Sequence, residues 1–302
     1  MIVGVDIGGT KIAVGAVDER GHLLARREAP TQAEQGFDAG VHRIVEMIRA
    51  VAAESGQAVQ GVGVGCTGPV DPQSGRIGQV DFLPGWEGAP IAAAIEAQLR
   101  VPVVLENDAD AAALGEWRWG SGRGQARTFL YVTISTGIGV GFIIDGHIYR
   151  GVDGAHPEIG HHVIDPTGPL CACGARGCWE SLASGTAMAR WFHENAPSHY
   201  SHKNLDARAI CVRDDDHARA AIQRTARYLG LGLANLITLF IPEVIALGGG
   251  LMRSRQLFWP TIQQIIDSHS GYVPRHRVAL TPARLGDDAG VIGAAWAWKI
   301  KQ

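Results

Sequence analysis

The chain has 302 residues, of which 27 are Lys or Arg and 30 are Asp or Glu, so its formal net charge is −3 at pH 7. This balance argues against a protein that binds nucleic acid through a basic surface. A hydrophobic share of 46% excludes disorder as the main state, and the length suits one large domain or two of average size. Glycine is unusually frequent, with 40 residues, which predicts many turns in which the backbone approaches another group closely.

The sequence carries no pattern typical of a membrane or secreted protein. Its longest apolar stretch, 229–241, is interrupted by Asn235 and falls short of the roughly 20 residues that span a membrane. Residues 1–6 lack the basic start and the long apolar core of a signal peptide. We therefore expect a cytoplasmic protein with no membrane partner. In a reducing compartment, three crowded cysteines among five favour a metal site over disulfides.

The first part of the chain predicts alternating strands and helices. Apolar, β-branched runs bounded by turn residues indicate strands, and the first three of them predict an antiparallel meander. Apolar residues at helical spacing indicate the helices. The expected strands are 2–7, 12–17, 23–27, 59–64 and 101–105, and the expected helices are 41–55, 91–99 and 109–117. This alternation predicts the α/β class.

The opening pattern recurs from about residue 129. A strand, a glycine-rich turn, a second strand, an Asp-Gly hairpin turn and a third strand follow one another. The two halves share no clear sequence identity, so coincidence is the alternative to a true repeat; a repeat predicts two lobes with matching turns. The expected strands are 129–134, 140–144, 147–149 and 244–247, and the expected helices are 187–195, 217–240 and 291–300.

Two glycine-rich turns are candidates for holding phosphate. The first runs from Asp6 to Lys11 after a buried strand, and its Gly8 and Gly9 would let backbone N–H groups approach an anion, while Thr10 adds a hydroxyl and Lys11 a charge. The second, 133–141, has hydroxyls and glycines at the equivalent place of the second half. An ordinary glycine hairpin is the alternative for each turn, but two in equivalent places favour phosphate. The triple glycine 248–250 after a strand is a weaker nucleotide-site candidate.

Asp108 is the candidate general base. It follows the strand 101–105 and falls at the beginning of an alanine-rich helix. The helix dipole there favours an ionised carboxylate that can accept a proton. The alternative is that Asp108 only caps the helix, which Asp and Asn do in proteins of every kind.

The segment 156–180 predicts a metal site. Its cysteines, Cys171, Cys173 and Cys178, together with a histidine such as His161 or a neighbour, make a Cys₃His donor set. Such a closed set of nitrogen and sulfur ligands is typical of structural zinc. The Cys-x-Cys-x₄-Cys spacing differs from the common Cys-x₂-Cys, so free thiols in a glycine-rich turn are the alternative.

Taken together and in this order, these motifs resemble the ROK family of sugar kinases and repressors over nearly the whole chain. The most specific match is Glu158-Ile159-Gly160-His161 followed by the cysteine segment 171–180. The resemblance implies the two-lobed actin-like ATPase fold, built from ribonuclease H-like domains with a central cleft. It also implies ATP, Mg²⁺ and a structural Zn²⁺ as cofactors and a hexose as substrate.

The resemblance also implies roles for individual residues. Asp108 matches the catalytic base and Asn107 a sugar-binding residue, while His161 would face zinc with one ring nitrogen and the sugar with the other. Asp6 would lie near the magnesium. The implied sugar-binding positions are Asn107, Asp108, Glu158, His161 and Glu180; the ATP positions are Asp6, Gly8, Gly9, Thr10, Lys11, Thr136, Gly137, Gly139, Gly249 and Gly250; and the zinc ligands are His161, Cys171, Cys173 and Cys178.

The expected activity is transfer of the γ-phosphate of Mg-ATP to the 6-hydroxyl of a hexose, with glucose favoured. Phe82 stands where many family glucokinases have a sugar-contacting Asn, and His156-Pro157 looks more like the family's fructokinases. Fructose, mannose and N-acetylated hexosamines therefore stay open as substrates. A sugar-sensing repressor is the remote alternative, because the first phosphate strand already begins at Ile2 and the net charge of −3 gives no attraction to a phosphate backbone.

The resemblance also suggests how the chain is divided and assembled. We expect an N-terminal lobe at 1–117, to which a C-terminal helix at 289–302 returns, and a larger lobe at 118–288 that carries the zinc loop. A homodimer or homotetramer is usual for such enzymes. The apolar stretch 229–240 is a place where a helix could pair with a second copy.

Overall fold

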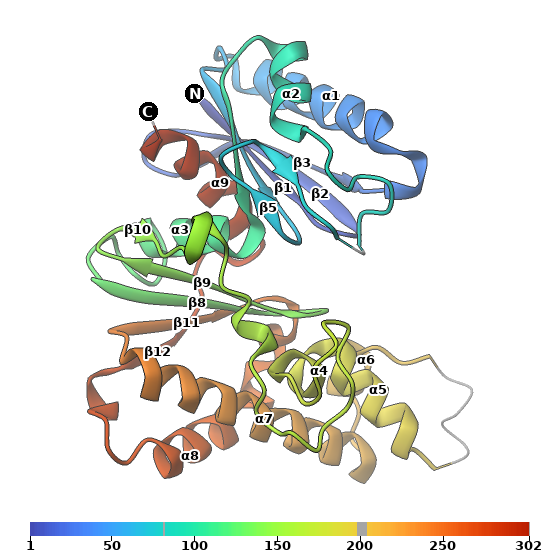
Figure 1. Cartoon of the computed structure of the whole chain (residues 1–302), viewed down its shortest axis with the longest axis vertical. Helices are drawn as coiled ribbons and strands as arrows, with labels where there is room; N and C mark the ends of the chain where they lie inside the picture. Colours follow the sequence, from blue (N-terminus) through green and yellow to red (C-terminus); the bar gives the residue numbers. More distant parts are fainter. Residues whose placement is uncertain (81, 198–203, 302) are drawn as a thin grey trace. The chain divides into compact units, whose positions relative to one another are not determined.

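A computed structural model describes residues 1–80, 82–197 and 204–301 (Figure 1). The α/β class expected from the sequence is confirmed, and the expected strands and helices are present with their ends shifted by a few residues. The strands are β1 (Ile2–Ile7), β2 (Lys11–Val17), β3 (Leu23–Pro30), β4 (Gly61–Cys66), β5 (Val70–Asp71), β6 (Arg76–Ile77), β7 (Val103–Asn107), β8 (Thr128–Ile134), β9 (Ile138–Ile144), β10 (His147–Ile148), β11 (Val244–Gly248) and β12 (Ala279–Pro282). The α-helices are α1 (Phe37–Ser55), α2 (Ile91–Leu99), α3 (Asp108–Arg118), α4 (Trp179–Ala183), α5 (Gly185–Asn195), α6 (Ala207–Cys211), α7 (Asp216–Phe240), α8 (Trp259–His269) and α9 (Ala289–Ile300).

The chain forms two compact units. The first comprises Met1–Tyr131, Gly141–Pro157 and Ala283–Gln302, and the second comprises Val132–Val140 and Glu158–Pro282. The lobe boundaries that the sequence suggested stay a prediction. Among the described residues, no helix is long and apolar enough to cross a membrane.

The two five-stranded sheets share one topology. Their strand orders are β3-β2-β1-β4-β7 and β10-β9-β8-β11-β12. Each order places an antiparallel meander on one side and two later strands on the other, and these later strands are parallel to a neighbour in each sheet. The repeat of organisation inferred from the sequence is therefore present in the fold.

Helices cover both faces of the first sheet (Figure 1). Successive side chains of a strand point to opposite faces of the sheet. Alternate residues of β1, including Val3 and Val5, therefore share one face, where they pack into a core with α1 and α2. Helix α9 packs on the opposite face of the sheet. There Gly4 and Gly63 have no side chain, and a Cβ at either would collide with the backbone of α9. These glycines let a helix from the far end of the chain lie directly on the sheet.

Parallel pairing brings the ends of β1, β4 and β7 to one edge of the first sheet. In register, Asp6 lies beside Gly65 and Gly65 beside Glu106, and the next residues in each strand are Ile7, Cys66 and Asn107. The carboxyl edge of parallel strands is where α/β folds place ligands. The first glycine-rich turn and the beginning of α3 therefore meet at a suitable place for a site.

In the second unit, the long helix α7 packs against α4, α5 and α8. Trp179, the first residue of α4, is fully buried, and its indole nitrogen donates a hydrogen bond to the carbonyl oxygen of Tyr228 at 3.0 Å. A Cβ at Gly232 would collide with this indole ring. The anchored tryptophan fixes the orientation of the next residue, Glu180.

Candidate active site

Asn107, and not Asp108, is the N-cap of α3. The side-chain oxygen of Asn107 accepts hydrogen bonds from the backbone nitrogens of Ala109 (2.9 Å) and Asp110 (3.2 Å). Its amide nitrogen donates to the carbonyl oxygen of Gly68 at 3.2 Å. The interpretation of Asp108 as a plain cap is therefore wrong, because the last residue of β7 already fills that place. Asp108 is the first helical residue, where the helix dipole favours a carboxylate.

Asp6 and Asp108 lie close enough to influence one another. Burial, reinforced by the negative charge of Asp108, raises the pKa of Asp6 to about 7. Gly290 of α9 lies against the Asp6 carboxylate, where a larger residue would collide with it. Two neighbouring carboxylates at a strand edge form a site that favours a cation. These donors fit Mg²⁺, which the resemblance implies near Asp6.

The first glycine-rich turn is a tight hairpin beside this edge. The backbone nitrogen of Gly8 donates to the carbonyl oxygen of Lys11 at 2.9 Å. Phe82 packs against the turn, since a Cβ at Gly9 would lie 2.8 Å from the Cβ of Phe82. The Lys11 amine lies 3.2 Å from a Glu28 carboxylate oxygen, so its charge is partly neutralised. Gly8, Gly9 and Thr10 are thus better placed than Lys11 to hold an anion.

In the second unit, the structure brings Glu180 to the second glycine-rich turn. One oxygen of Glu180 accepts a hydrogen bond from the backbone nitrogen of Ile138 at 2.8 Å. Gly137 lies against the same carboxylate, where a Cβ would collide with it. No local pattern predicts this contact, because 42 positions separate the two partners.

The triple-glycine loop lies beside the same turn. Gly249 has a φ of +87° and packs directly on the backbone of Ile134, while Gly250 lies near the hydroxyl of Ser135. This left-handed backbone and close approach both favour glycine. Gly249 and Gly250 therefore lie against Ile134 and Ser135, directly before Thr136 and the Gly137 that contacts Glu180.

His161 connects the second turn to the cysteine cluster. The preceding Gly160 packs against the carbonyl oxygen of Ile138, leaving no room for a side chain. The Nε2 atom of His161 lies 3.9 Å from a Glu180 oxygen, and its Nδ1 atom lies 3.4 Å from the Sγ of Cys171. One ring nitrogen thus faces the cysteines and the other faces Glu180. Glu158 is exposed, and its carbonyl oxygen accepts a hydrogen bond from the backbone nitrogen of His161.

The four expected metal ligands form one cluster. Their ligand atoms, on His161, Cys171, Cys173 and Cys178, all lie within 4.8 Å of one another. The Sγ atoms of Cys173 and Cys178 are 3.5 Å apart. Tetrahedral zinc with Zn–S distances of about 2.3 Å requires sulfurs roughly 3.8 Å apart. The donor types and their spacing therefore fit Zn²⁺.

The sequence-predicted residues divide between the two units. Asp6, the turn 8–11, Asn107 and Asp108 belong to the first unit, and the remaining candidates belong to the second. In each unit the glycine-rich turn follows the central strand of the sheet, β1 or β8, which the repeated topology explains.

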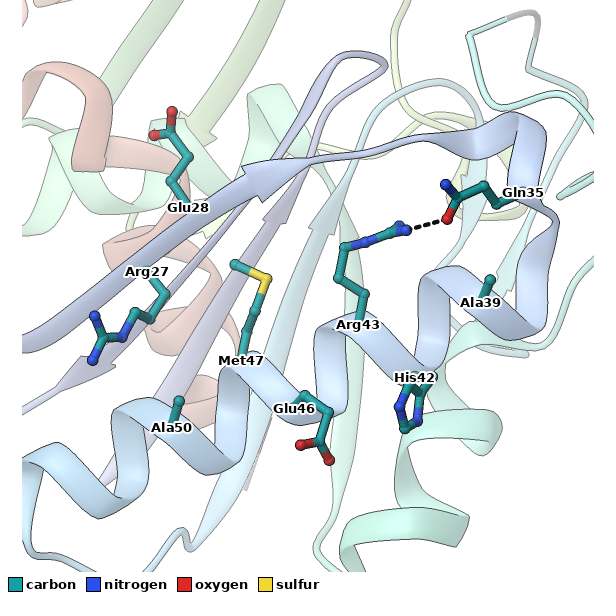
Figure 2. A pocket seen from close by; sticks show the side chains of 9 residues that line it. All are labelled: Arg27, Glu28, Gln35, Ala39, His42, Arg43, Glu46, Met47 and Ala50. Carbon is teal, nitrogen blue, oxygen red and sulfur yellow. Dashed lines mark hydrogen bonds between the residues drawn. The ribbon is translucent and has the colours of Figure 1, made fainter.

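A separate hollow of about 580 Å³ lies between β3 and α1 of the first unit (Figure 2). None of the candidate residues is among the described residues that line it. Its charged groups have partners: Arg27 pairs with Glu54, and Arg43 donates to the side chain of Gln35 and to the carbonyl oxygen of Thr31. Nothing in this hollow indicates a binding function.

The cysteine cluster leads to a prediction about metal content. Elemental analysis should find one zinc per chain, and Cys178→Ser should lose it. The midpoint of thermal unfolding should then fall by about 5–10 °C, because a structural zinc contributes folding free energy. Cys211→Ser is the matched control, since Cys211 is also buried but lies outside the cluster. A fully active wild-type protein without zinc would contradict this assignment.

Comparison with known proteins agrees with this arrangement. The model of the ROK family matches residues 2–301. A glucokinase from Thermotoga maritima is 34% identical, with 97% of this chain and 96% of the relative covered. The solved ROK hexokinase from Thermus thermophilus superimposes with a TM-score of 0.86 at 35% identity, covering 99% of each chain. A ROK glucokinase from Streptomyces griseus, solved in complex with glucose and AMPPNP, gives a TM-score of 0.85 at 33% identity, covering 98% of each chain. The chain therefore belongs to the ROK family and has the fold of its sugar kinases.

Proposed function

We propose that the protein is an ATP-dependent hexose kinase that transfers the γ-phosphoryl group of Mg-ATP to the 6-hydroxyl of glucose. The observation that carries the proposal is the placement of Asp108 as the first residue of α3, beside Asp6 at the carboxyl edge of the first sheet. The similarity to glucokinases, one of them solved with glucose and an ATP analogue, supports the choice of substrate and donor.

In this proposal, Asp108 accepts the proton of the attacking sugar hydroxyl. Phosphoryl transfer depends mainly on positioning and on neutralising charge, so one well-placed base is sufficient. The oxygen of Asn107 accepts from two backbone N–H groups, and one N–H of its amide donates to the carbonyl oxygen of Gly68. The second N–H of the amide is left to donate to a sugar hydroxyl. Asn107 thus has two roles: it begins the helix and contributes one hydrogen bond.

The remaining candidates bind the two substrates. The carboxylates of Glu158 and Glu180 would accept hydrogen bonds from the hydroxyls of the sugar, and His161 would donate one from Nε2. The glycine-rich turns would bind the nucleotide phosphates through backbone N–H groups. Mg²⁺ would neutralise phosphate charge near Asp6, and Zn²⁺ would fix the orientation of His161. The nucleotide positions are Asp6, Gly8, Gly9, Thr10, Lys11, Thr136, Gly137, Gly139, Gly249 and Gly250.

The proposal extends to location and assembly. Because Mg-ATP is the phosphoryl donor, we assign the enzyme to the cytoplasm, where the donor is abundant. Leu239, Phe240 and Ile241 at the end of α7 are exposed hydrophobic residues, which is consistent with a homodimer or homotetramer. No nucleic acid is expected as a partner.

The position of transfer is tested with 6-deoxyglucose, which lacks only the proposed acceptor. Glucose and Mg-ATP should give glucose 6-phosphate, detected by a coupled dehydrogenase assay. The deoxy sugar should inhibit this reaction competitively without being phosphorylated. Phosphorylation of 6-deoxyglucose would contradict transfer to the 6-hydroxyl.

Glu180→Gln tests the sugar-binding assignment. Glutamine can still accept the hydrogen bond from Ile138, so the second turn stays intact while the negative charge is lost. Because hydrogen bonds to a charged group contribute about 1.5–3 kcal/mol, the KM for glucose should rise about 10-fold or more. The KM for Mg-ATP should change by less than about 3-fold. Glu194→Gln, at an exposed glutamate of the same unit, is the control; a larger change for ATP than for glucose would refute the assignment.

A further inference from the structure

Two buried acidic side chains flank Asp108 at the junction of β7 and α3. The side chain of Glu106, two residues before it, is 3% exposed, and that of Asp110, two residues after it, is 0% exposed. The proposed function assigns neither of them to the sugar or the nucleotide. Burying two carboxylates beside a third is unfavourable unless cations neutralise them.

One guanidinium group bridges the two carboxylates. Arg150, which follows β10, donates from one terminal nitrogen to Glu106 and from the other to Asp110. The planar, forked donors of arginine suit such a double contact, which a lysine cannot reproduce. The end of the strand and the first turn of the helix are thereby joined through a side chain 40 positions beyond Asp110.

A lysine and a histidine complete the network. The Nζ atom of Lys301, just after α9, lies 2.7 Å from an oxygen of Glu106. The Nδ1 atom of His156 lies 2.8 Å from Oδ2 of Asp110, and this histidine is 7% exposed. The acids on the junction therefore contact cations from two distant segments of the first unit.

Asp110 is poorly explained as a residue kept for stability alone. Its Oδ1 atom is buried and has no hydrogen-bond partner among the residues that the structure describes. A buried polar atom without a partner costs about 1–3 kcal/mol. Replacing a buried charge network by apolar residues is often neutral or stabilising. The network therefore fits a role in positioning better than a role in folding.

We propose that Arg150 and His156 are positioning residues for Asp108, an inference that rests on the proposed role of Asp108 as the base. Arg150 fixes the backbone on both sides of Asp108 through Glu106 and Asp110. His156 holds Asp110 in the rotamer that Arg150 requires. Displacing a reacting group by about 1 Å can cost 100-fold in rate, so this junction must be rigid.

The test uses the full-length enzyme with glucose and Mg-ATP. Arg150→Met should lower kcat by about 10–100-fold, with both KM values within about 3-fold of wild type. The kcat of Arg150→Lys should lie between those of wild type and Arg150→Met, since lysine keeps the charge but reaches only one carboxylate. Arg127→Met is the matched control: Arg127 is an exposed arginine of the same unit, paired with Asp145, and its loss should leave kcat unchanged.

A double-mutant cycle separates positioning from a structural role. If Arg150 acts through Asp108, adding Arg150→Met to Asp108→Asn should lower kcat by less than about 3-fold further. A merely structural role would instead give the same loss in both backgrounds. If Arg150→Met does not fold, His156→Gln takes its place in the cycle, with an expected loss of about 3–10-fold in the wild-type background and no further loss in Asp108→Asn.

The outcomes distinguish this inference from the proposed function. If the wild-type enzyme turns over, two results would overturn the positioning role and leave the proposed function intact. One is a normal kcat in Arg150→Met, and the other is additive losses of kcat in the double-mutant cycle. Absence of wild-type turnover with any sugar overturns the proposed function and this inference with it. A loss of kcat that vanishes in the Asp108→Asn background supports the positioning role.

Discussion

Asp108→Asn should lower kcat for glucose phosphorylation by about 10²–10⁴-fold, the range typical of a lost general base. Asparagine has nearly the same shape and can accept the hydrogen bond that Asp108 takes from the backbone nitrogen of Ala109 at 2.8 Å. The helix and its Asn107 cap should therefore be unaffected. The variant removes proton acceptance and little else. Steady-state assays of ADP release measure the effect.

Sugar affinity is the internal control for this variant. Calorimetric titration with glucose should give a Kd raised by no more than about 10-fold, because the amide keeps a hydrogen bond to the sugar and loses only its charge. The loss in kcat should therefore far exceed the loss in affinity. Near-normal kcat would remove Asp108 from the role of base. Loss of glucose binding with unchanged kcat at saturation would make it a binding residue.

Asp6→Asn should stabilise the metal-free protein while impairing catalysis. Burial and the charge of Asp108 raise the pKa of Asp6 from 3.8 to about 7, so the ionised form is disfavoured in the folded state. At pH 8 the neutral asparagine should raise the free energy of unfolding by about 2–4 kcal/mol. Turnover should fall by about 10²-fold, because the carboxylate that we propose lies near Mg²⁺ is lost.

The gain in stability has a defined pH dependence. Below pH 3.8, Asp6 is protonated in both states and the substitution gives no gain. Between pH 3.8 and 7 only the unfolded chain releases the proton, so the gain grows with rising pH and is complete above about pH 7. Urea unfolding at pH 5 and pH 8 measures the difference. An equal gain in the free energy of unfolding at both pH values would show that ionisation of Asp6 does not destabilise the folded state.

Asp71→Asn is a matched control, because the pKa of Asp71 is shifted in the opposite direction from that of Asp6. The hydrogen bond from the Ser74 hydroxyl, with others from the backbone, lowers the pKa of the exposed Asp71. Its ionised form therefore stabilises the folded state above the unfolded pKa, and the asparagine variant should be no more stable than wild type at pH 8.

Local signals in the sequence were sufficient for much of the fold. The meander 2–27 and the buried strands could be predicted because β-branched runs and turn residues alternate there. Short or weakly patterned elements were missed. Helix α8 buries only Ile262 and Ile266 among its described core residues, so its apolar stripe is too narrow to stand out. Helix α4 is one turn long and depends on the packing of Trp179.

In the candidate site, too, residues with a strong local signal could be predicted, and features that depend on folding could not. The cysteine cluster could be predicted because Cys171, Cys173 and Cys178 are close in sequence and share one chemistry. The choice between Asn107 and Asp108 as the helix cap could not be predicted, since both side chains can cap a helix. Pairing of Asn107 with Cys66 in the sheet keeps Asn107 extended and decides it.

Contacts between distant residues were beyond the reach of sequence patterns. Arg150 shares no spacing or motif with Glu106 and Asp110, which lie 44 and 40 positions before it. Only the folded chain brings them together around Asp108. The residues that hold a catalytic group in place are harder to find in a sequence than the group itself.

ADP release with Mg-ATP tests the central claim most directly when it is measured across several sugars at matched concentration. The panel comprises glucose, mannose, fructose, N-acetylglucosamine and N-acetylmannosamine. We expect turnover with glucose well above the other sugars, and none without sugar. Preference for another hexose would keep the kinase but correct its substrate. Absence of ADP release with every sugar would contradict the account of this protein as a hexose kinase.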